Sequence, residues 1–269
     1  MKAKEQMERF REYLMEEERS ENTINTYLDT LGIFFDNFPE ISKQNMLKFK
    51  QLQLETRKPK TVHNRIVAMN QFCKFTGHPE WCVKQIKIQN SSSVENVISV
   101  QEFNKLLNGL KEDGNVRGYF FVKFLAKTGA RASEFVRLDK SGLDKGYCEM
   151  WTKGKIRRIY IPRSLIEESR EYFKGVEGEL LFPSRCGRQM TTRGVAQNIK
   201  TWAAKYEIRK EVAYPHSFRH LFAIEFLKRN PNISLLADLM GHSNVQTTSI
   251  YLKLSKEEQM KQFNEASGW

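Results

Sequence analysis

The sequence has 269 residues, of which 40% are apolar, enough to bury the core of one large domain or of two ordinary ones. Its 44 Lys and Arg side chains against 32 Asp and Glu give a formal net charge of +12, which favours a polyanion as partner. A membrane protein is excluded because no run approaches about 18 apolar residues. A targeting segment is not expected because Met1–Glu21 is acidic and helical, and a disulfide framework is not expected because the four cysteines include no C-x-x-C pair.

These exclusions leave a cytoplasmic globular protein, and its N-terminal part predicts four amphipathic helices. In Ala3–Leu14, and again after the cap Ser20, apolar side chains recur at three- and four-residue spacings, the periodicity of one helix face. A third helix begins after Ser42, and a fourth follows the basic turn Arg57–Lys60. Residues 1–79 are therefore expected to form a small helical domain.

The basic side chains of this domain have two interpretations. In the first they form a clamp that contacts DNA phosphates. In the second they are solvated charges on the surface of a helix bundle, and these residues alone favour neither interpretation. The side chains that the first interpretation assigns to DNA binding are Arg57, Lys58, Lys60 and Lys74.

Residues 80–97 break the helical periodicity and predict a connector between two domains. The segment contains Gln89–Ser93, a run of small and polar residues that is typical of linkers. Ser99 and Glu102 then have the spacing of a helix capping box, so a new helix is expected to begin here. Residues 98–269, which include a tail at 253–269, form the second expected domain.

The sequence of the second domain predicts helices around a small β-sheet. The expected fold class is therefore mainly α with a small sheet (α+β). Tyr119–Lys127 is apolar enough for a buried helix, and a short helix is expected at Ala132–Leu138. The β-branched and aromatic stretches Tyr147–Trp151 and Ile156–Ile161 predict a β-hairpin with Lys153 at or near its tip. The later helices are expected at Ser164–Phe173, Thr191–Tyr206, His216–Arg229 and Ile233–Met240.

Two arginines of this domain could stabilise the transition state of phosphodiester cleavage. An attacked phosphorus becomes five-coordinate and its oxygens gain negative charge, which the forked donors of guanidinium groups are suited to bind. Arg131 lies at a helix start beside a glycine turn, and Glu134 follows it at the spacing of an ion pair. Arg219 lies one helical turn after His216, so these two side chains share a face.

Four further side chains could move the protons and form the covalent bond. Lys153 could protonate the leaving oxygen, and Tyr251 could form a phosphotyrosyl ester. His216 and His242 could donate hydrogen bonds and transfer protons. Each residue alone has an ordinary interpretation as a packed aromatic, a charged hairpin, a surface ion pair or a structural histidine.

The order of these residues and their local sequences resemble the tyrosine recombinase (phage integrase) family. The spacing of His242 and Tyr251 is also similar to that of the family. The N-terminal helical part resembles the family's core-binding domain more loosely, most closely at Thr23–Tyr27. The four matching motifs are TGARASE (128–134), TKGK (152–155) with Arg158 and Pro162 downstream, PHSFRH (215–220) and LMGHS with TT and Y (239–251).

This resemblance implies a core-binding domain at residues 1–79 and a catalytic domain at 98–269, as in a simple, Xer-like member. It implies that Tyr251 attacks a DNA phosphate, forming a 3′-phosphotyrosyl link and freeing a 5′-hydroxyl, without ATP, metal or another cofactor. The implied partners are double-stranded DNA and further copies of the chain: a homotetramer on two DNA sites, and a monomer or weak oligomer when free. The residues implied to activate the phosphate are Arg131, Lys153, His216, Arg219 and His242, with Glu134 supporting Arg131 or His216.

Several alternatives stay open. Lys155 competes with Lys153 for the role of general acid, but Lys153 precedes the glycine as the family's lysine does, which leaves Lys155 as a DNA-binding candidate. The tail, with Met260, Phe263 and Trp269, docks either on a neighbouring subunit or on its own chain. Alternative functions are a type IB topoisomerase-like enzyme that relaxes DNA and a non-catalytic DNA-binding protein of the same fold.

Overall fold

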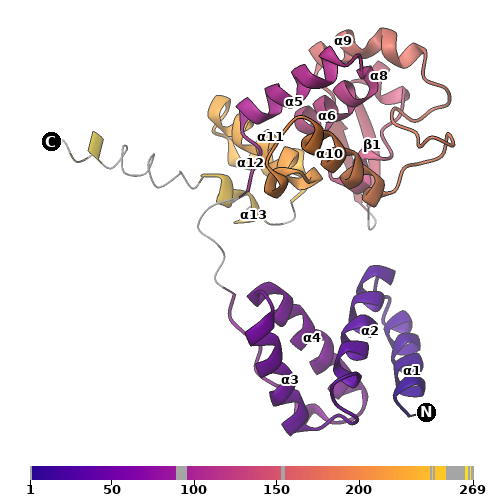
Figure 1. Ribbon diagram of the computed structural model, residues 1–269, viewed down its shortest axis with the longest axis vertical. Helices are drawn as coiled ribbons and strands as arrows, with labels where there is room; N and C mark the ends of the chain where they lie inside the picture. The colour runs from indigo at the N-terminus through magenta and orange to yellow at the C-terminus, as the bar shows by residue number, and fades with distance from the viewer. Residues whose placement is uncertain are drawn as a thin grey trace. The chain divides into compact units, whose positions relative to one another are not determined.

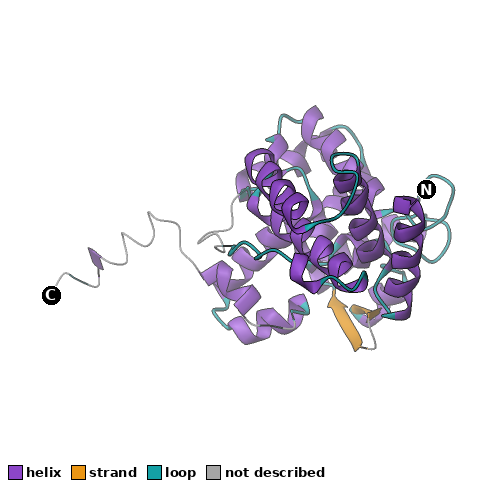
Figure 2. Ribbon diagram, turned by 90° about the horizontal axis from the view of Figure 1, so that it is seen from below, coloured by secondary structure: helices purple, strands orange, loops and turns teal. Residues whose placement is uncertain are grey.

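The chain divides into two compact units, Met1–Asn90 and Ser91–Trp269, each described here by itself. The structure, a computed structural model (Figure 1), describes residues 2–88, 96–152, 155–242, 244, 246–252, 264, 265 and 267. Helices dominate both units, and one antiparallel hairpin supplies the strands of the described residues (Figure 2). The predicted fold class is therefore confirmed. Within the described residues, no helix is both long and apolar enough to cross a bilayer.

The first unit is a bundle of helices with an aromatic core. Phe10 and Phe72 meet edge to face with 5.1 Å between their ring centroids, and Phe34 and Phe49 do the same at 5.2 Å. All four rings are fully buried, and each comes from a different helix. The elements of this unit are α1 (Lys2–Glu16), α2 (Glu21–Phe35), α3 (Lys43–Thr56), α4 (Pro59–Phe75) and the short 3₁₀ helix η1 (Pro79–Trp81).

The chain after η1 still belongs to the first unit. The side-chain amide of Asn70 donates to the Val83 carbonyl at 2.9 Å and accepts from the Val83 N–H at 3.0 Å. Val83 itself is buried, and Lys50 donates to the carbonyl of Lys84 at 2.7 Å. The expected connector began at residue 80, whereas Val83, Lys84 and Ile86 contact α3 and α4. One buried valine and paired backbone groups hold this stretch without any helical periodicity.

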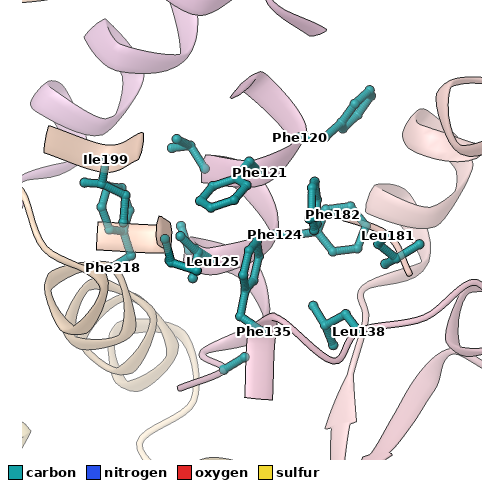
Figure 3. Close-up of a cluster of buried hydrophobic side chains, with 14 of the residues drawn as sticks. Phe120, Phe121, Phe124, Leu125, Phe135, Leu138, Leu181, Phe182, Ile199 and Phe218 are labelled. Atoms are coloured by element: carbon teal, nitrogen blue, oxygen red, sulfur yellow. The ribbon is translucent and has the colours of Figure 1, made fainter. Parts of the chain in front are cut away.

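The second unit is built around the apolar helix α6 (Val116–Thr128). Phe121 and Phe124 of α6 are fully buried and contact Phe135 and Phe182 from later segments, with 4.6 Å between the Phe121 and Phe135 centroids (Figure 3). The other α-helices are α5 (Val100–Glu112), α7 (Ala132–Phe135), α8 (Ser141–Lys145), α9 (Arg163–Lys174), α10 (Thr192–Lys205), α11 (Pro215–Arg229), α12 (Ile233–Met240) and α13 (Gln246–Ser249), and the 3₁₀ helices are η2 (Lys210–Val212) and η3 (Ile250–Leu252).

The hairpin pairs β1 (Tyr147–Thr152) with β2 (Lys155–Tyr160). Cys148 lies opposite Ile159 and Met150 opposite Arg157, and the apolar members of these pairs are buried. The alternate pair, Trp151 and Ile156, is exposed, as the two-residue period of a strand requires. Arg157 therefore lies on the face that turns toward the protein interior.

Candidate active site

The turn between α6 and α7 fixes the first predicted arginine. Gly129 ends α6 with a φ of 60°, and a Cβ there would lie 2.5 Å from Phe222 of α11, so this turn approaches α11 as only glycine allows. Arg131 directly precedes α7 and occupies its N-cap position. Its backbone N–H and Nη1 both donate to the carboxylate of Glu134, at 2.7 and 2.9 Å. The guanidinium is held in place while 35% of its side chain stays exposed.

Glu134 pairs with a second arginine that the sequence analysis did not select. Arg157 of β2 reaches inward and forms an ion pair with the same carboxylate, which is only 3% exposed. Burial opposes ionisation of this carboxyl, but the positive charges of Arg157 and Arg131 and the Arg131 backbone N–H hold the pKa of Glu134 below its usual range. Glu134 is therefore a buried anion shared by two cations.

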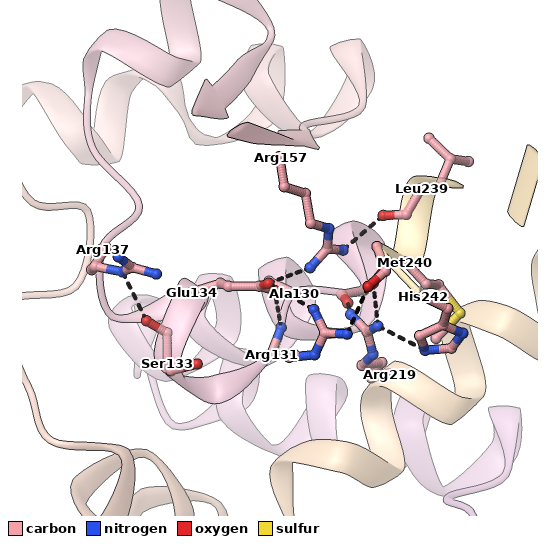
Figure 4. Close-up of polar contacts among 12 residues, drawn as sticks. Ala130, Arg131, Ser133, Glu134, Arg137, Arg157, Arg219, Leu239, Met240 and His242 are labelled. Carbon is pink, nitrogen blue, oxygen red and sulfur yellow. Dashed lines mark hydrogen bonds and ion pairs between the residues drawn. The ribbon is translucent and has the colours of Figure 1, made fainter. Parts of the chain in front are cut away.

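Three arginines converge on the C-terminal end of α12 (Figure 4). Consecutive carbonyls accept from them: Leu239 from Arg157 Nη2 at 2.7 Å, Met240 from Arg219 Nη2, and Gly241 from Arg131 Nη2 at 3.0 Å. The last carbonyls of a helix lack partners within the helix and carry its negative dipole end, so cations are stabilised there. The arginine cluster, Arg131, Arg157 and Arg219, is thus organised by one helix end.

Arg219 is the most deeply buried member of the arginine cluster. It projects from α11 with 2% exposure and also donates through Nη1 to the carbonyl of Gly129. Burial, together with the positive charges of Arg131 and Arg157, lowers the pKa of Arg219 to about 9. An anion entering the cluster would relieve this repulsion.

His242 follows the α12 end directly and completes the contact with Arg219. Arg219 Nη2 lies 3.1 Å from His242 Nε2, and His242 Nδ1 lies 2.7 Å from the buried Thr248 hydroxyl. Since a guanidinium only donates, Nε2 must be the acceptor and Nδ1 carries the proton. Burial and the charges of Arg219 and Arg131 lower the pKa of His242 to about 4, so the ring is neutral at physiological pH.

His216 occupies the start of α11, one turn before Arg219, with its side chain exposed. Desolvation of the ring and the charges of Arg219 and Arg131 hold the pKa of His216 below its usual range. A neutral imidazole at this position can donate a hydrogen bond to an anion and also accept a proton.

Tyr251 lies in η3, which packs against α11. Its phenol oxygen is 2.6 Å from Nδ1 of His220, and its ring packs on the cluster of Ala223, Leu236 and Met240. Burial raises the pKa of Tyr251 to about 12, although the positive charge of Arg219 acts in the opposite direction. The phenol is thus protonated at rest and lies within the electrostatic range of Arg219.

Two contact residues of this site, Arg157 and His220, were missed in the sequence. Alternation along β2 was the available signal for Arg157, because it shares a strand face with buried Ile159. For His220 the signal was helical, since it lies four residues after His216 on the same face of α11.

The remaining predicted residues are placed as follows. Lys153, the expected general acid, lies outside the described residues, and so does the side chain of Lys155. In the first unit, Arg57 and Lys58 are exposed at the turn between α3 and α4, Lys60 is exposed in the first turn of α4, and Lys74 is exposed near its end.

The site combines an arginine cluster that can bind an anion with neutral histidines and an adjacent tyrosine, the groups that cleavage and rejoining of a DNA phosphodiester through a tyrosyl ester requires. The chain belongs to the phage integrase family, whose sequence model matches residues 96–258. It is 27% identical over 245 residues to the tyrosine recombinase XerC of Shigella flexneri, covering 87% of this chain and 80% of that protein.

Two further proteins extend the likeness over most of the chain. The tyrosine recombinase XerA of Pyrococcus furiosus is 26% identical over 261 residues, covering 93% of this chain and 90% of the relative. The solved XerH site-specific recombinase, bound to its difH substrate before cleavage, has a TM-score of 0.70 at 20% identity, covering 91% of this chain and 79% of XerH. The likeness to XerH is one of fold.

Proposed function

We propose that this chain is a site-specific recombinase in which Tyr251 attacks a DNA phosphate held by Arg131 and Arg219. The observation that carries the proposal is the convergence of Arg131, Arg219 and His242 at the α12 end, with the phenol of Tyr251 within electrostatic range of Arg219. Arg131 is half-buried and can reach a phosphate from the solvent side. Buried Arg219 would hold a non-bridging oxygen from the other side.

In the proposed reaction, the Tyr251 oxygen forms a bond to phosphorus, the phenol proton passes to the neutral ring of His216, and the bond from phosphorus to the 5′ oxygen breaks. The 5′ oxygen leaves with a proton from Lys153, the proposed general acid. The 5′-hydroxyl of a partner strand then attacks the phosphotyrosyl ester and gives its proton to Lys153, while His216 returns a proton to the departing Tyr251 oxygen. Because the ester retains the energy of the broken bond, rejoining needs no ATP.

His216 and His242 have complementary proposed roles. Neutral His242 keeps Arg219 oriented through Nε2, while the exposed ring of His216 is available to donate to a phosphate oxygen or transfer a proton. Glu134 and Arg157 would act through Arg131, because the shared carboxylate fixes both guanidinium groups. They are positioning residues.

The proposed partners are double-stranded DNA and further copies of the chain. Exchange between two duplexes breaks four strands, and one tyrosine per strand gives a homotetramer on two DNA sites, formed from monomers or weak oligomers. The first unit would act as a core-binding domain, contacting the phosphate backbone through Arg57, Lys58, Lys60 and Lys74, with Lys155 adding a contact from the hairpin. The tail at 253–269 would dock on a neighbouring or on its own subunit, and the protein would act in the cytoplasm.

The nucleophile is tested with the variant Tyr251→Phe on a nicked duplex, from which the cleaved fragment diffuses away and traps the covalent adduct. We expect unchanged DNA binding in a mobility-shift assay and no adduct on a denaturing gel. Tyr206→Phe is the matched control, because it removes another phenol hydroxyl, which contacts Asp113. An adduct formed by Tyr251→Phe would remove Tyr251 from the mechanism.

The general acid is tested with a DNA substrate that has sulfur in place of the bridging 5′ oxygen, since a thiolate leaves without a proton. Lys153→Ala should cleave ordinary DNA slowly, at least about 100-fold below the parent protein, and cleave the sulfur substrate at nearly the parent rate. Lys155→Ala should show no such rescue. The opposite pattern would transfer the role to Lys155.

The relatives are recombinases and do not favour a topoisomerase-like or a non-catalytic function. Relaxation of supercoiled plasmid by the monomer at any sequence would support the topoisomerase-like function. Absence of any trapped adduct on the protein's own recombination site would support the non-catalytic one.

A further inference from the structure

His220 contacts the proposed nucleophile, and the reaction steps described above assign it no role. It is half-buried on α11, next to Arg219 and four residues after His216. Its ring centroid lies 6.0 Å from that of His216 and 5.5 Å from that of Tyr251. His220 is therefore a neighbour both of His216 and of the phenol.

The contact between His220 and Tyr251 fixes the direction of the phenol hydroxyl. The 2.6 Å separation of Nδ1 and the phenol oxygen is a short hydrogen bond, and the tyrosine ring is held from the side by Ala223, Leu236 and Met240. Apolar packing fixes the plane of the ring but leaves the O–H free to rotate. In the tautomer of His220 that carries its proton on Nε2, Nδ1 accepts from the phenol and sets that rotation.

We propose that His220 is a positioning residue for Tyr251: its Nδ1 accepts a hydrogen bond from the phenol O–H and so aims an oxygen lone pair at the phosphate held by Arg131 and Arg219. This inference rests on the proposed function, in which Tyr251 is the nucleophile. It requires the tautomer of His220 that carries its proton on Nε2. The hydrogen bond is made before DNA binds and persists until the phenol oxygen forms its bond to phosphorus.

The charge state of His220 is consistent with an acceptor that orients the phenol and does not deprotonate it in advance. Burial and the positive charges of His216 and Arg219 lower the pKa of His220 to about 4. The ring is therefore neutral at neutral pH, and in the tautomer that carries its proton on Nε2 the Nδ1 atom can accept. The pKa of the phenol is about 12, so the proton remains on Tyr251 at rest. The hydroxyl leaves this contact only as the bond to phosphorus forms and its proton passes to His216.

Two nearly isosteric variants test the proposal. Asparagine places Oδ1 where histidine has Nδ1 and can accept the same hydrogen bond, whereas leucine fills the space without an acceptor. We expect His220→Leu to slow single-turnover adduct formation on a nicked duplex by about tenfold or more. His220→Asn should stay within about threefold of the parent rate. DNA affinity, from mobility shifts, should be unchanged in both variants.

The outcomes separate this inference from the proposed function. Parent-like cleavage by His220→Leu, or equal slowing by Leu and Asn, would overturn the role of His220 even when Tyr251→Phe forms no adduct. Adduct from Tyr251→Phe would instead overturn the proposed nucleophile.

A chemical rescue decides the matter if His220→Leu loses thermal stability. His220→Ala leaves a space in which added imidazole can bind and supply the missing acceptor. Recovery of the cleavage rate with imidazole, and no recovery with an equal concentration of a non-accepting salt such as ammonium chloride, supports the positioning role. No recovery with imidazole overturns it.

Discussion

At the scale of single residues, the order of the arginine cluster depends on Glu134. One carboxylate with 3% exposure receives Arg131 from α7 and Arg157 from β2, and so links a helix start to a strand. Without its negative charge, two guanidinium groups would face each other in a poorly solvated region. Removing one partner of a buried ion pair lowers the free energy of unfolding by more than the pair itself contributes to it, because the remaining charges are left uncompensated.

We expect Glu134→Gln, which keeps the shape but loses the charge, to lower the free energy of unfolding of the second unit by about 3 kcal/mol. Urea denaturation measures this loss, and DNA cleavage should fall with it because Arg131 is no longer held. Glu149→Gln is the matched control, since Glu149 forms a solvent-exposed ion pair with Arg158. That change should cost less than about 1 kcal/mol. Equal losses in the two variants would contradict this account of Glu134.

At this scale the sequence alone predicts most residues of the site, but not every residue that contacts them. It selected Arg131, Arg219, His216, His242 and Tyr251, and the structure brings these side chains to neighbouring positions on α7, α11 and the segment after α12. It missed Arg157 because two adjacent arginines on β2 look equivalent until the strand's buried face is known. Which chain segment lies opposite Glu134 depends on long-range packing, and no local pattern specifies that.

At the scale of elements, the turn after α12 is built to a narrow tolerance. Gly241 adopts a φ of 60°, and its missing side chain leaves the space that Arg157 occupies, since a Cβ there would overlap Arg157 Cδ. Glycine therefore meets two requirements here: it adopts the positive φ that leads the backbone to His242, and it leaves room for Arg157 in the arginine cluster.

Two glycine substitutions separate these requirements. Gly146 has a φ of 81° and nothing within 4 Å of a built Cβ, so Gly146→Ala should show only the cost of a positive φ, about 1 kcal/mol. Gly241→Ala should cost roughly 1 kcal/mol more and should also reduce DNA cleavage, because Arg157 must move. Chemical denaturation and adduct formation are the measurements. Similar stability losses with intact cleavage would show that the fit to Arg157 is unimportant.

Helix starts were the elements that the sequence predicted best. Ser20, Ser42, Ser99 and Thr191 each accept a hydrogen bond from the third residue beyond them, because capping is a local interaction. Residues 80–88 were harder to assign, since their order comes from contacts with α3 and α4 and not from their own periodicity. Tertiary contacts decide such segments.

At the scale of the whole molecule, the net charge of +12 is spread over both units. If the first unit tracks a phosphate backbone, its exposed basic residues contribute an electrostatic attraction that does not depend on sequence. Cleavage chemistry would remain a property of the second unit.

The combined variant Arg57→Gln, Lys58→Gln and Lys60→Gln should therefore weaken binding to specific and random DNA by similar factors. The slope of log K against log salt should fall by about 1 for each phosphate that is no longer neutralised. The cleavage rate at saturating DNA should stay unchanged. Lys174→Gln, an exposed charge at the end of α9, is the control and should not alter the slope. An unaltered slope in the combined variant would exclude this basic turn from the DNA interface.

The three carbonyl oxygens at the end of α12 accept hydrogen bonds from the arginine cluster, as the oxygens of a bound phosphate would. They bring mutually repelling guanidinium groups to one place during folding, before any nucleic acid arrives. The loss of side-chain freedom and the approach of like charges are then consequences of folding, not of substrate capture. The guanidinium groups are therefore already in position when the scissile phosphate binds. More of the binding free energy is then left to stabilise the transition state of strand cleavage.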